Sequence, residues 1–235
     1  MMASKERILL KISGGALSSA GETYDEQKLL DLASQIKDLQ KNYDVGIVIG
    51  GGNICRGRER KIKFLSSFYR DYMGMASTVL NGFVLQGALS YLKVKSRLFS
   101  SLEIERISEK INLSEVEKTL NSGEVVIFSG GLGEPCFSTD SAAFIRAIEI
   151  RATKVLIGKS GVKGVYNRDP KSFLDAEFQP SISYDRLISE DIRILDLPSL
   201  LLAKENNLTL LIFNQEENLC FIKALRGEID LSIVR

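Results

Sequence analysis

The chain has 235 residues, 44% of them hydrophobic, which is enough for one sizeable core. Its 31 basic and 30 acidic residues are spread along the sequence, and this balance argues against a nucleic-acid-binding surface. No apolar run approaches the roughly eighteen residues of a membrane span, and the N-terminus lacks the apolar core of a signal peptide. The three cysteines, Cys55, Cys136 and Cys220, are far apart, as is typical of a reducing compartment. We therefore expect a soluble, cytoplasmic protein without nucleic-acid or membrane partners.

The sequence contains no histidine, and this excludes several classes of chemistry. Ser-His-Asp and Cys-His nucleophile pairs, His-ligated zinc and His acid–base catalysis all need an imidazole. Any reaction must therefore depend on Lys, Arg, Asp, Glu, Tyr, backbone amides or a metal held by oxygen ligands.

Short apolar runs alternate with segments of helical periodicity along the whole chain. Strands are predicted at residues 8–13, 45–50, 94–99, 124–129, 153–158 and 208–213. Helices are predicted at residues 25–43, 66–92, 113–123, 139–151, 197–207 and 216–227, the second with a weak point at Met73–Met75. This alternation indicates an α/β fold, a three-layer αβα sandwich with a mostly parallel central sheet. Residues 158–185 are the least regular segment and the best candidate for a mobile loop or lid.

Four glycine-rich segments follow predicted strands. They are KISGG (11–15), GGGNICRG (50–57), SGGLGEP (129–135) and GKSGVKG (158–164). Glycine lets backbone N–H groups turn toward an anion, and ligands of open α/β sheets bind beyond the carboxyl ends of the strands. One such loop simply ends a strand, but four at one edge indicate a long phosphate-rich cleft. The sequence has neither a GxxxxGK[ST] motif nor a dinucleotide-binding glycine fingerprint, which disfavours both of those enzyme classes.

Three charged residues in or beside these loops, and Asp71 on the predicted long helix, each allow two interpretations. Lys11, late in an apolar strand, is either a phosphate ligand or an ordinary edge lysine. Arg56 is either a phosphate clamp or a surface arginine within a basic run. Asp140 either caps a helix or orients a lysine or metal, and Asp71 is either solvated or a ribose ligand. The YNRDP turn (166–170) is ordinary turn chemistry by itself.

The order of these motifs resembles the bacterial UMP kinases, a family of the amino-acid kinase superfamily. The matching motifs are K-I-S-G, V-I-G-G-G-N-I-C-R-G, D-Y-M-G-M, G-L-G-E-P-C-F-S-T-D and G-V-Y-N-R-D-P, within residues 5–234. DYMGM together with GGGN-x-x-RG is specific to that family, whereas the KxSG opening is shared with carbamate, aspartate and acetylglutamate kinases. The resemblance implies one amino-acid kinase domain over residues 1–235. Within it, about residues 1–150 would bind UMP and about residues 151–235 would bind ATP.

The resemblance implies transfer of the ATP γ-phosphate to UMP, giving UDP and ADP in pyrimidine nucleotide biosynthesis. It also implies Mg²⁺ held mainly through the ATP phosphates, without a metal site of the protein's own, and a homohexamer. The long helix at 66–92 is the candidate contact surface. One alternative is a kinase of the same fold acting on a small carboxylate or carbamate, which DYMGM disfavours. The other is a non-catalytic uridylate-binding regulator, which would not need both Lys11 and Asp140.

Carried over by position, the resemblance implies catalytic roles for Lys11 and Asp140. The implied UMP-binding residues are Gly51, Arg56, Asp71, Leu132, Gly133, Glu134, Pro135, Cys136, Phe137, Ser138 and Thr139. The implied ATP-binding residues are Lys11, Ile12, Ser13, Gly14, Gly52, Arg56, Ser160, Tyr166 and Asp169. Lys159 and Asp196 are two further candidates near the nucleotide.

The sequence departs from the family pattern at several positions. Gly15 stands where the family usually has glutamate, and Lys163 where aspartate is frequent. Cys55 and Cys136 replace bulkier residues. Glu134 replaces an asparagine, which brings a negative charge close to an anionic ligand.

Overall fold

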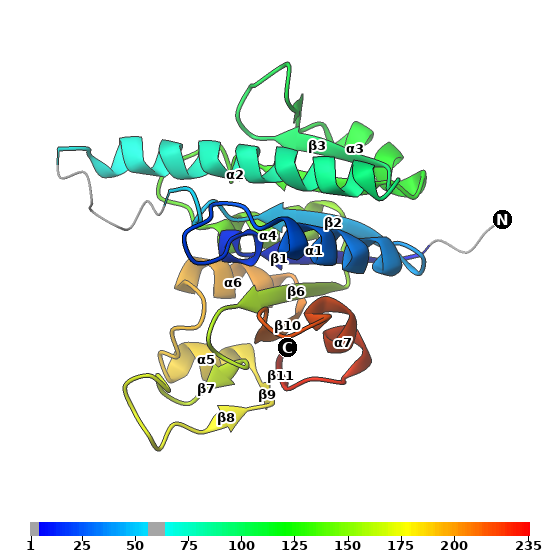
Figure 1. The fold of residues 1–235 in the computed structure, drawn as a ribbon. Coiled ribbons are helices and arrows are strands. Elements are labelled where there is room, and N and C mark those ends of the chain that lie inside the picture. The colour runs from blue at the N-terminus through cyan, green and yellow to red at the C-terminus, as the bar shows by residue number, and fades with distance from the viewer. Residues whose placement is uncertain (1–4, 56–63) are drawn as a thin grey trace.

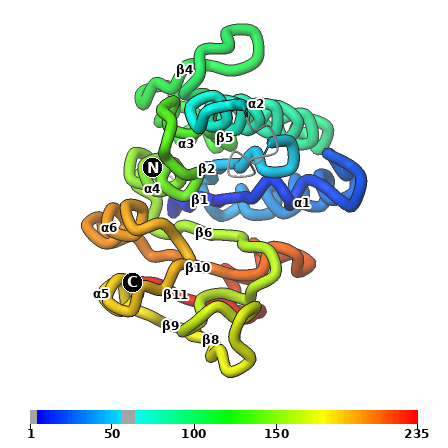
Figure 2. Tube along the Cα trace, turned by 90° about the vertical axis from the view of Figure 1, so that its left-hand side faces the viewer, coloured from blue at the N-terminus to red at the C-terminus, as the bar shows by residue number. Residues whose placement is uncertain are grey.

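The computed structural model describes residues 5–55 and 64–235, in which strands and helices alternate (Figure 1). A nine-stranded sheet in these residues has the order β4-β3-β5-β2-β1-β6-β10-β11-β9, which Figure 2 shows from top to bottom. Its strands are β1 (Glu6–Ile12), β2 (Tyr43–Ile49), β3 (Ser96–Ser100), β4 (Glu109–Lys110), β5 (Val125–Ser129), β6 (Lys154–Lys159), β9 (Ser181–Ile182), β10 (Thr209–Asn214) and β11 (Leu231–Val234). A separate pair joins β7 (Val165–Tyr166) to β8 (Phe178–Gln179).

Neighbouring strands of the large sheet run parallel, except that β10 and β11 are antiparallel. Side chains of β1 enter two cores in turn: Ile8 and Leu10 join one buried cluster, and Leu9 joins the other. Because both faces of the sheet are covered at its centre, the central strands β2 and β5 are almost continuously buried and do not alternate between buried and exposed residues.

The helices form a layer on each face of the sheet. One layer holds α1 (Glu26–Leu39), α2 (Ser67–Tyr91) and α7 (Cys220–Arg226). The other holds α3 (Leu113–Asn121), α4 (Thr139–Glu149), α5 (Tyr184–Ser189) and α6 (Leu197–Glu205). The predicted three-layer αβα sandwich with a mostly parallel sheet is therefore confirmed. None of the helices in the described residues is long and apolar enough to cross a membrane.

Several details differ from the sequence-based expectations. Helix α2 continues without a break through Gly74, so the expected weak point at Met73–Met75 is wrong. Residues 158–185 contain β7, β8, β9 and the start of α5, and a short 3₁₀ turn, Gly14–Leu17, follows β1. The last helix begins only at Cys220, because Leu219 before it has a left-handed backbone with φ of 56°.

Candidate active site

A cavity of about 850 Å³ lies at the carboxyl edge of the central strands. Its walls include residues from all four glycine-rich segments, among them Ser13, Gly51, Gly131 and Ser160. The predicted gathering of these loops at one edge of the sheet is therefore correct, because parallel neighbours β5, β2, β1 and β6 all end there.

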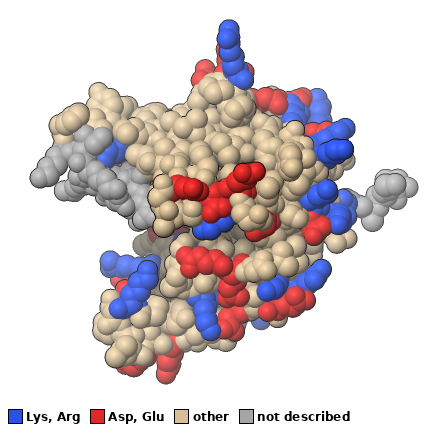
Figure 3. Space-filling view, viewed as in Figure 1, with Lys and Arg blue, Asp and Glu red and all other residues tan. Residues whose placement is uncertain are grey.

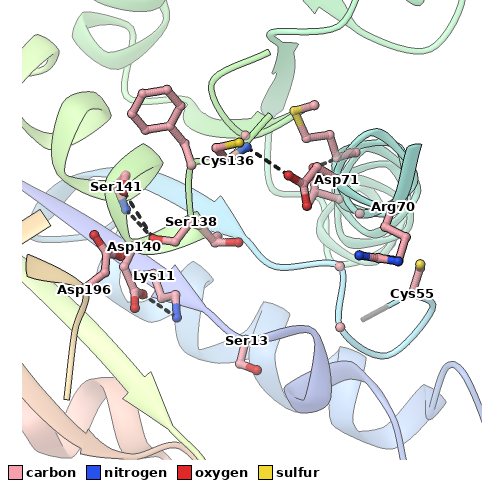
Figure 4. A pocket seen from close by; sticks show the side chains of 18 of the residues that line it. Lys11, Ser13, Cys55, Arg70, Asp71, Cys136, Ser138, Asp140, Ser141 and Asp196 are labelled. Atoms are coloured by element: carbon pink, nitrogen blue, oxygen red, sulfur yellow. Dashed lines mark hydrogen bonds and ion pairs between the residues drawn. The ribbon is translucent and has the colours of Figure 1, made fainter. Parts of the chain in front are cut away.

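The carboxylate of Asp140 lies between two lysine side chains in this cavity. Lys11 Nζ is 2.7 Å from Asp140 Oδ1, and Lys159 Nζ is 3.1 Å from Oδ2 (Figure 4 shows the first pair). The two lysines come from the adjacent strands β1 and β6, and Asp140 comes from the first turn of α4. The helix dipole stabilises a carboxylate there. Ser138 caps this helix by accepting from Ser141 N, so Asp140 is not used as the cap.

The ionisation of this cluster follows from burial and mutual charge. Burial alone would raise the pKa of Asp140, but the charges of Lys11 and Lys159 outweigh it and hold that pKa below its ordinary value. Burial and the charge of Lys11 both lower the pKa of Lys159. The charge of Asp140 raises it, but by less, so the pKa lies below its ordinary value. Two lysines thus face one carboxylate, and this excess of basic groups favours an anionic ligand.

The loops after β1 and β2 contact each other closely. A Cβ atom on Gly14 would lie 2.5 Å from Asn53 Oδ1 and 2.8 Å from Gly52 N, so only glycine fits there. Asn81, fully buried on α2, donates to Gly50 O at 2.6 Å and to Asn53 Oδ1 at 2.7 Å. Helix α2 thus anchors the glycine loop that follows β2.

The same helix also holds the loop of residues 130–138, which we call the acceptor loop. Cys136 N donates to Asp71 Oδ2 at 2.9 Å, and Gly130 N donates to Thr78 Oγ1 at 2.7 Å. Cys136 has φ of 73°, a left-handed conformation that few residues other than glycine adopt. Two loops of the cavity therefore depend on the inner face of α2.

Asp196 connects the acceptor loop to the C-terminal part of the chain. It caps α6 by accepting from Ser199 N at 3.0 Å, and its Oδ2 accepts from Ser138 Oγ at 2.5 Å. Burial would raise the pKa of Asp196, but the hydroxyls of Ser138 and Ser199 and the Ser199 N–H donate to the carboxylate and lower the pKa below its ordinary value. The carboxylate joins the starts of α4 and α6 across the cavity.

Gln215 is a buried residue that the sequence analysis missed. Its Oε1 accepts from Ser13 N at 3.3 Å, and its Nε2 donates to Ser160 Oγ at 2.7 Å. One amide thereby joins the loop after β1 to the loop after β6. Its position two residues after the predicted strand 208–213, at the same sheet edge as the four glycine segments, was the available signal.

Many of the expected site residues line the cavity. These are Lys11, Ser13, Gly51, Gly52, Asp71, Glu134, Cys136, Phe137, Ser138, Thr139, Asp140, Lys159, Ser160 and Asp196. The lining does not include Ile12, Gly14, Leu132, Gly133, Pro135, Tyr166 and Asp169. Lining residues that had no expected role are Gly15, Cys55, Arg70, Gly74, Met75, Thr78, Gly131, Ser141, Gly158 and Pro198. Arg56 lies outside the described residues.

The two expected ATP residues farthest along the chain have local partners. Tyr166 packs on Phe178 across the β7–β8 pair, with ring centroids 5.6 Å apart. The Asp169 carboxylate accepts from Lys171 N and from Ser172 Oγ, each at 2.9 Å, and so closes a turn. Both residues belong to the arm that projects beyond β9 and α5 in Figure 1.

Comparisons with known proteins agree on one family. Residues 6–214 match the model of the amino acid kinase family. The uridylate kinase of Mycoplasma capricolum is 41% identical over 229 residues, which cover 97% of each chain. The uridylate kinase of Mycoplasmoides gallisepticum is 39% identical over 226 residues, or 95% of this chain and 96% of that protein. The crystal structure of UMP kinase from Ureaplasma parvum superposes with a TM-score of 0.94 at 36% identity, covering 98% of both chains.

Proposed function

The chain belongs to the amino acid kinase family and, within it, to the uridylate kinases, and we propose that it phosphorylates UMP. It transfers the γ-phosphate of ATP to UMP and releases UDP and ADP, a step in the synthesis of pyrimidine nucleotides. The observation that carries this proposal is the Lys11–Asp140–Lys159 cluster in the lining of a cavity to which four glycine-rich loops contribute. Neither the carboxylate kinase nor the non-catalytic regulator is favoured, since the near-full-length relatives are uridylate kinases.

The reaction needs no histidine. The acceptor phosphate of UMP is already an oxyanion at neutral pH, so no base has to remove a proton before it attacks the γ-phosphorus of ATP. Catalysis of such a transfer consists mainly of in-line positioning and charge stabilisation. The ammonium groups of Lys11 and Lys159 stabilise negative charge on the transferring group, and Asp140 fixes both of them.

Different parts of the single domain would bind the two nucleotides. Residues 1–150 bind UMP, with Asp71 at the ribose hydroxyls and the stretch from Leu132 to Thr139 along the uridylate. Residues 151–235 bind ATP, with Ser160, Tyr166 and Asp169 on the nucleotide side. The hydrogen bond between the Asp71 carboxylate and Cys136 N supports the first assignment, because it joins α2 to the acceptor loop. We accordingly expect the protein to act in the cytoplasm, where ATP and UMP are available.

Magnesium is expected to arrive with ATP. In the described residues, no three His, Cys, Asp or Glu side chains are grouped as a metal site would require. Asp140 and Asp196 are engaged with lysines and with serines. Mg²⁺ retains several waters and commonly binds through substrate phosphates with few protein ligands, and such a mode fits these residues. Bound there, it would neutralise charge on the ATP phosphates.

The outer face of α2 is the surface through which we expect the chain to form a homo-oligomer, a hexamer by family resemblance. Tyr69, Leu80, Phe83 and Tyr91 are 59%, 48%, 50% and 75% exposed, and they recur at intervals close to whole helical turns. In Figure 3, the region of α2 is largely free of charged side chains, whereas acidic and basic groups are interspersed over much of the remaining face. Such a stripe is typical of a surface that a second copy covers.

The decisive experiment measures ADP formation by the purified protein with Mg·ATP, with and without UMP. CMP, dUMP, carbamate and acetylglutamate serve as alternative acceptors. We expect turnover that depends on UMP. Binding of UMP without turnover would favour the regulator instead, and turnover with a carboxylate or carbamate would contradict the uridylate assignment.

A further inference from the structure

The cavity would bind two anionic nucleotides, yet carboxylates are numerous among the charged residues that line it. Among residues 5–55 and 64–235, the lining cations are Lys11, Arg70 and Lys159, and the lining carboxylates are Asp71, Glu134, Asp140 and Asp196. Both lysines are paired with the Asp140 carboxylate. Within residues 5–55 and 64–235, Arg70 is therefore the lining cation that has no carboxylate partner.

The environment of Arg70 is unusual for an ordinary surface arginine. It lies in the first turn of α2, where the helix dipole favours anions and disfavours cations. Its Nη1 donates to Leu65 O at 2.6 Å, which fixes the guanidinium, whereas its buried Nε has no hydrogen-bond partner. The guanidinium is therefore held in one orientation at the wall of the cavity.

The guanidinium also lies in a suitable place for an anion. In Figure 4 it is between the Asp71 carboxylate and the Cys55 thiol, on the α2 side of the cavity, across from Lys11. Gly74 is one turn farther along the same face of α2, and a Cβ on Gly51 would come 2.7 Å from Gly74 O. Arg70 is thus one helical turn from the point where the glycine loop after β2 packs on the helix.

We propose that Arg70 binds the phosphate of the acceptor nucleotide, a monoester dianion, together with the glycine loop after β2. This inference rests on the proposed uridylate kinase function and adds a specific ligand to it. A guanidinium presents N–H donors in a planar fork that matches two phosphate oxygens. Arg70 would hold the phosphate from the α2 side while Lys11 meets it from the side of the incoming γ-phosphate.

The proposal also accounts for Glu134. This carboxylate replaces the asparagine of the family pattern and lines the same cavity. In the part of the chain that the structure describes, lining carboxylates outnumber lining cations by one, and loss of Arg70 would double that excess. Arg70 therefore offsets the added negative charge near the anionic ligand.

The test compares Arg70→Gln, Arg70→Lys and the wild type in steady-state assays and in equilibrium binding of UMP and of uridine without ATP. Arg70→Gln should raise the KM and Kd for UMP by about 10- to 100-fold, as expected for loss of a charge-assisted hydrogen bond. The KM for ATP and the affinity for uridine should not change, because neither ligand presents a phosphate to this side. Arg70→Lys should lie between the wild type and Arg70→Gln, and Arg193→Gln, an exposed arginine elsewhere, should match the wild type.

Two results would overturn the role of Arg70 and leave the proposed function intact. One is UMP turnover with an unchanged KM for UMP in Arg70→Gln. The other is an equal loss of affinity for UMP and uridine, because Arg70 would then act only by fixing the start of α2 through Leu65. If the wild type bound UMP but did not phosphorylate it, the proposed function would fail. The difference between UMP and uridine binding would still decide whether Arg70 contacts the phosphate.

Discussion

Lys11 contributes a charge at the point where phosphate is transferred, and Asp140 keeps it there. Replacing Lys11 by alanine removes one preorganised donor, which typically costs about 10² to 10³ in kcat. We expect a loss of that size with little change in the KM for UMP. A coupled assay for ADP measures it, and near-normal turnover would remove Lys11 from the mechanism.

Deprotonation of Lys159 should reduce the activity of the enzyme at alkaline pH. Burial lowers its pKa from the ordinary value of 10.5, so it loses its proton at a lower pH than an exposed lysine. Because the charged form is the active one, kcat/KM for ATP should fall as the pH rises through this lowered pKa.

In the Lys159→Arg variant the guanidinium stays protonated, so this fall should move to higher pH even if the maximal rate is lower. The profiles are measured at saturating UMP, and ionisation of the substrates is the same for both proteins. If kcat/KM for ATP fell over the same alkaline pH range in both proteins, a group other than Lys159 would be responsible for the fall.

Site residues could be predicted from the sequence where they belong to a local motif. Lys11, Asp71 and Asp140 stand in recognisable segments, and the cavity includes all three. Arg70 precedes DYMGM directly, yet an arginine at a helix start is most often solvated. Gln215 contacts Ser13 across 202 positions of sequence, and no local periodicity reports such a contact.

At the scale of elements, Gln215 follows β10 and joins the loops after β1 and β6. Breaking this connection should weaken the use of ATP more than the use of UMP. Gln215→Leu removes two hydrogen bonds worth roughly 1 kcal/mol each, so kcat/KM for ATP should fall by up to about 30-fold. The matched control is Gln86→Leu, which removes a hydrogen bond to Ser96 O away from the cavity. Equal kinetic effects in the two variants would show that the loss is general.

The long elements were predictable and the short ones were not. Continuous apolar runs predicted β1, β2, β5, β6 and β10, because a strand buried on both faces needs such a sequence. The two-residue strands β7, β8 and β9 have no room for a periodic pattern. Strand β11 is also short, and it pairs antiparallel with β10, unlike the parallel strands of a βαβ pattern.

At the scale of the whole molecule, the apolar stripe on α2 predicts self-association. Phe83→Glu places a charge in the centre of this stripe and should shift the protein toward smaller species, measured by light scattering after size exclusion. Leu174→Glu is the control, since Leu174 is fully exposed and distant in sequence from α2. An unchanged mass in Phe83→Glu would mean that another surface joins the copies.

The cavity is lined by two thiols, those of Cys55 and Cys136, to which a fluorescent reporter can be attached. The chain contains no tryptophan, so its intrinsic ultraviolet emission is weak and leaves a clear spectral window. Cys220 is buried, and burial raises the pKa of its thiol to about 11, whereas Cys136 is exposed and Cys55 is partly exposed. A thiol-reactive dye should therefore attach at the nucleotide cavity without any engineering, and its brightness would record ligand entry in real time.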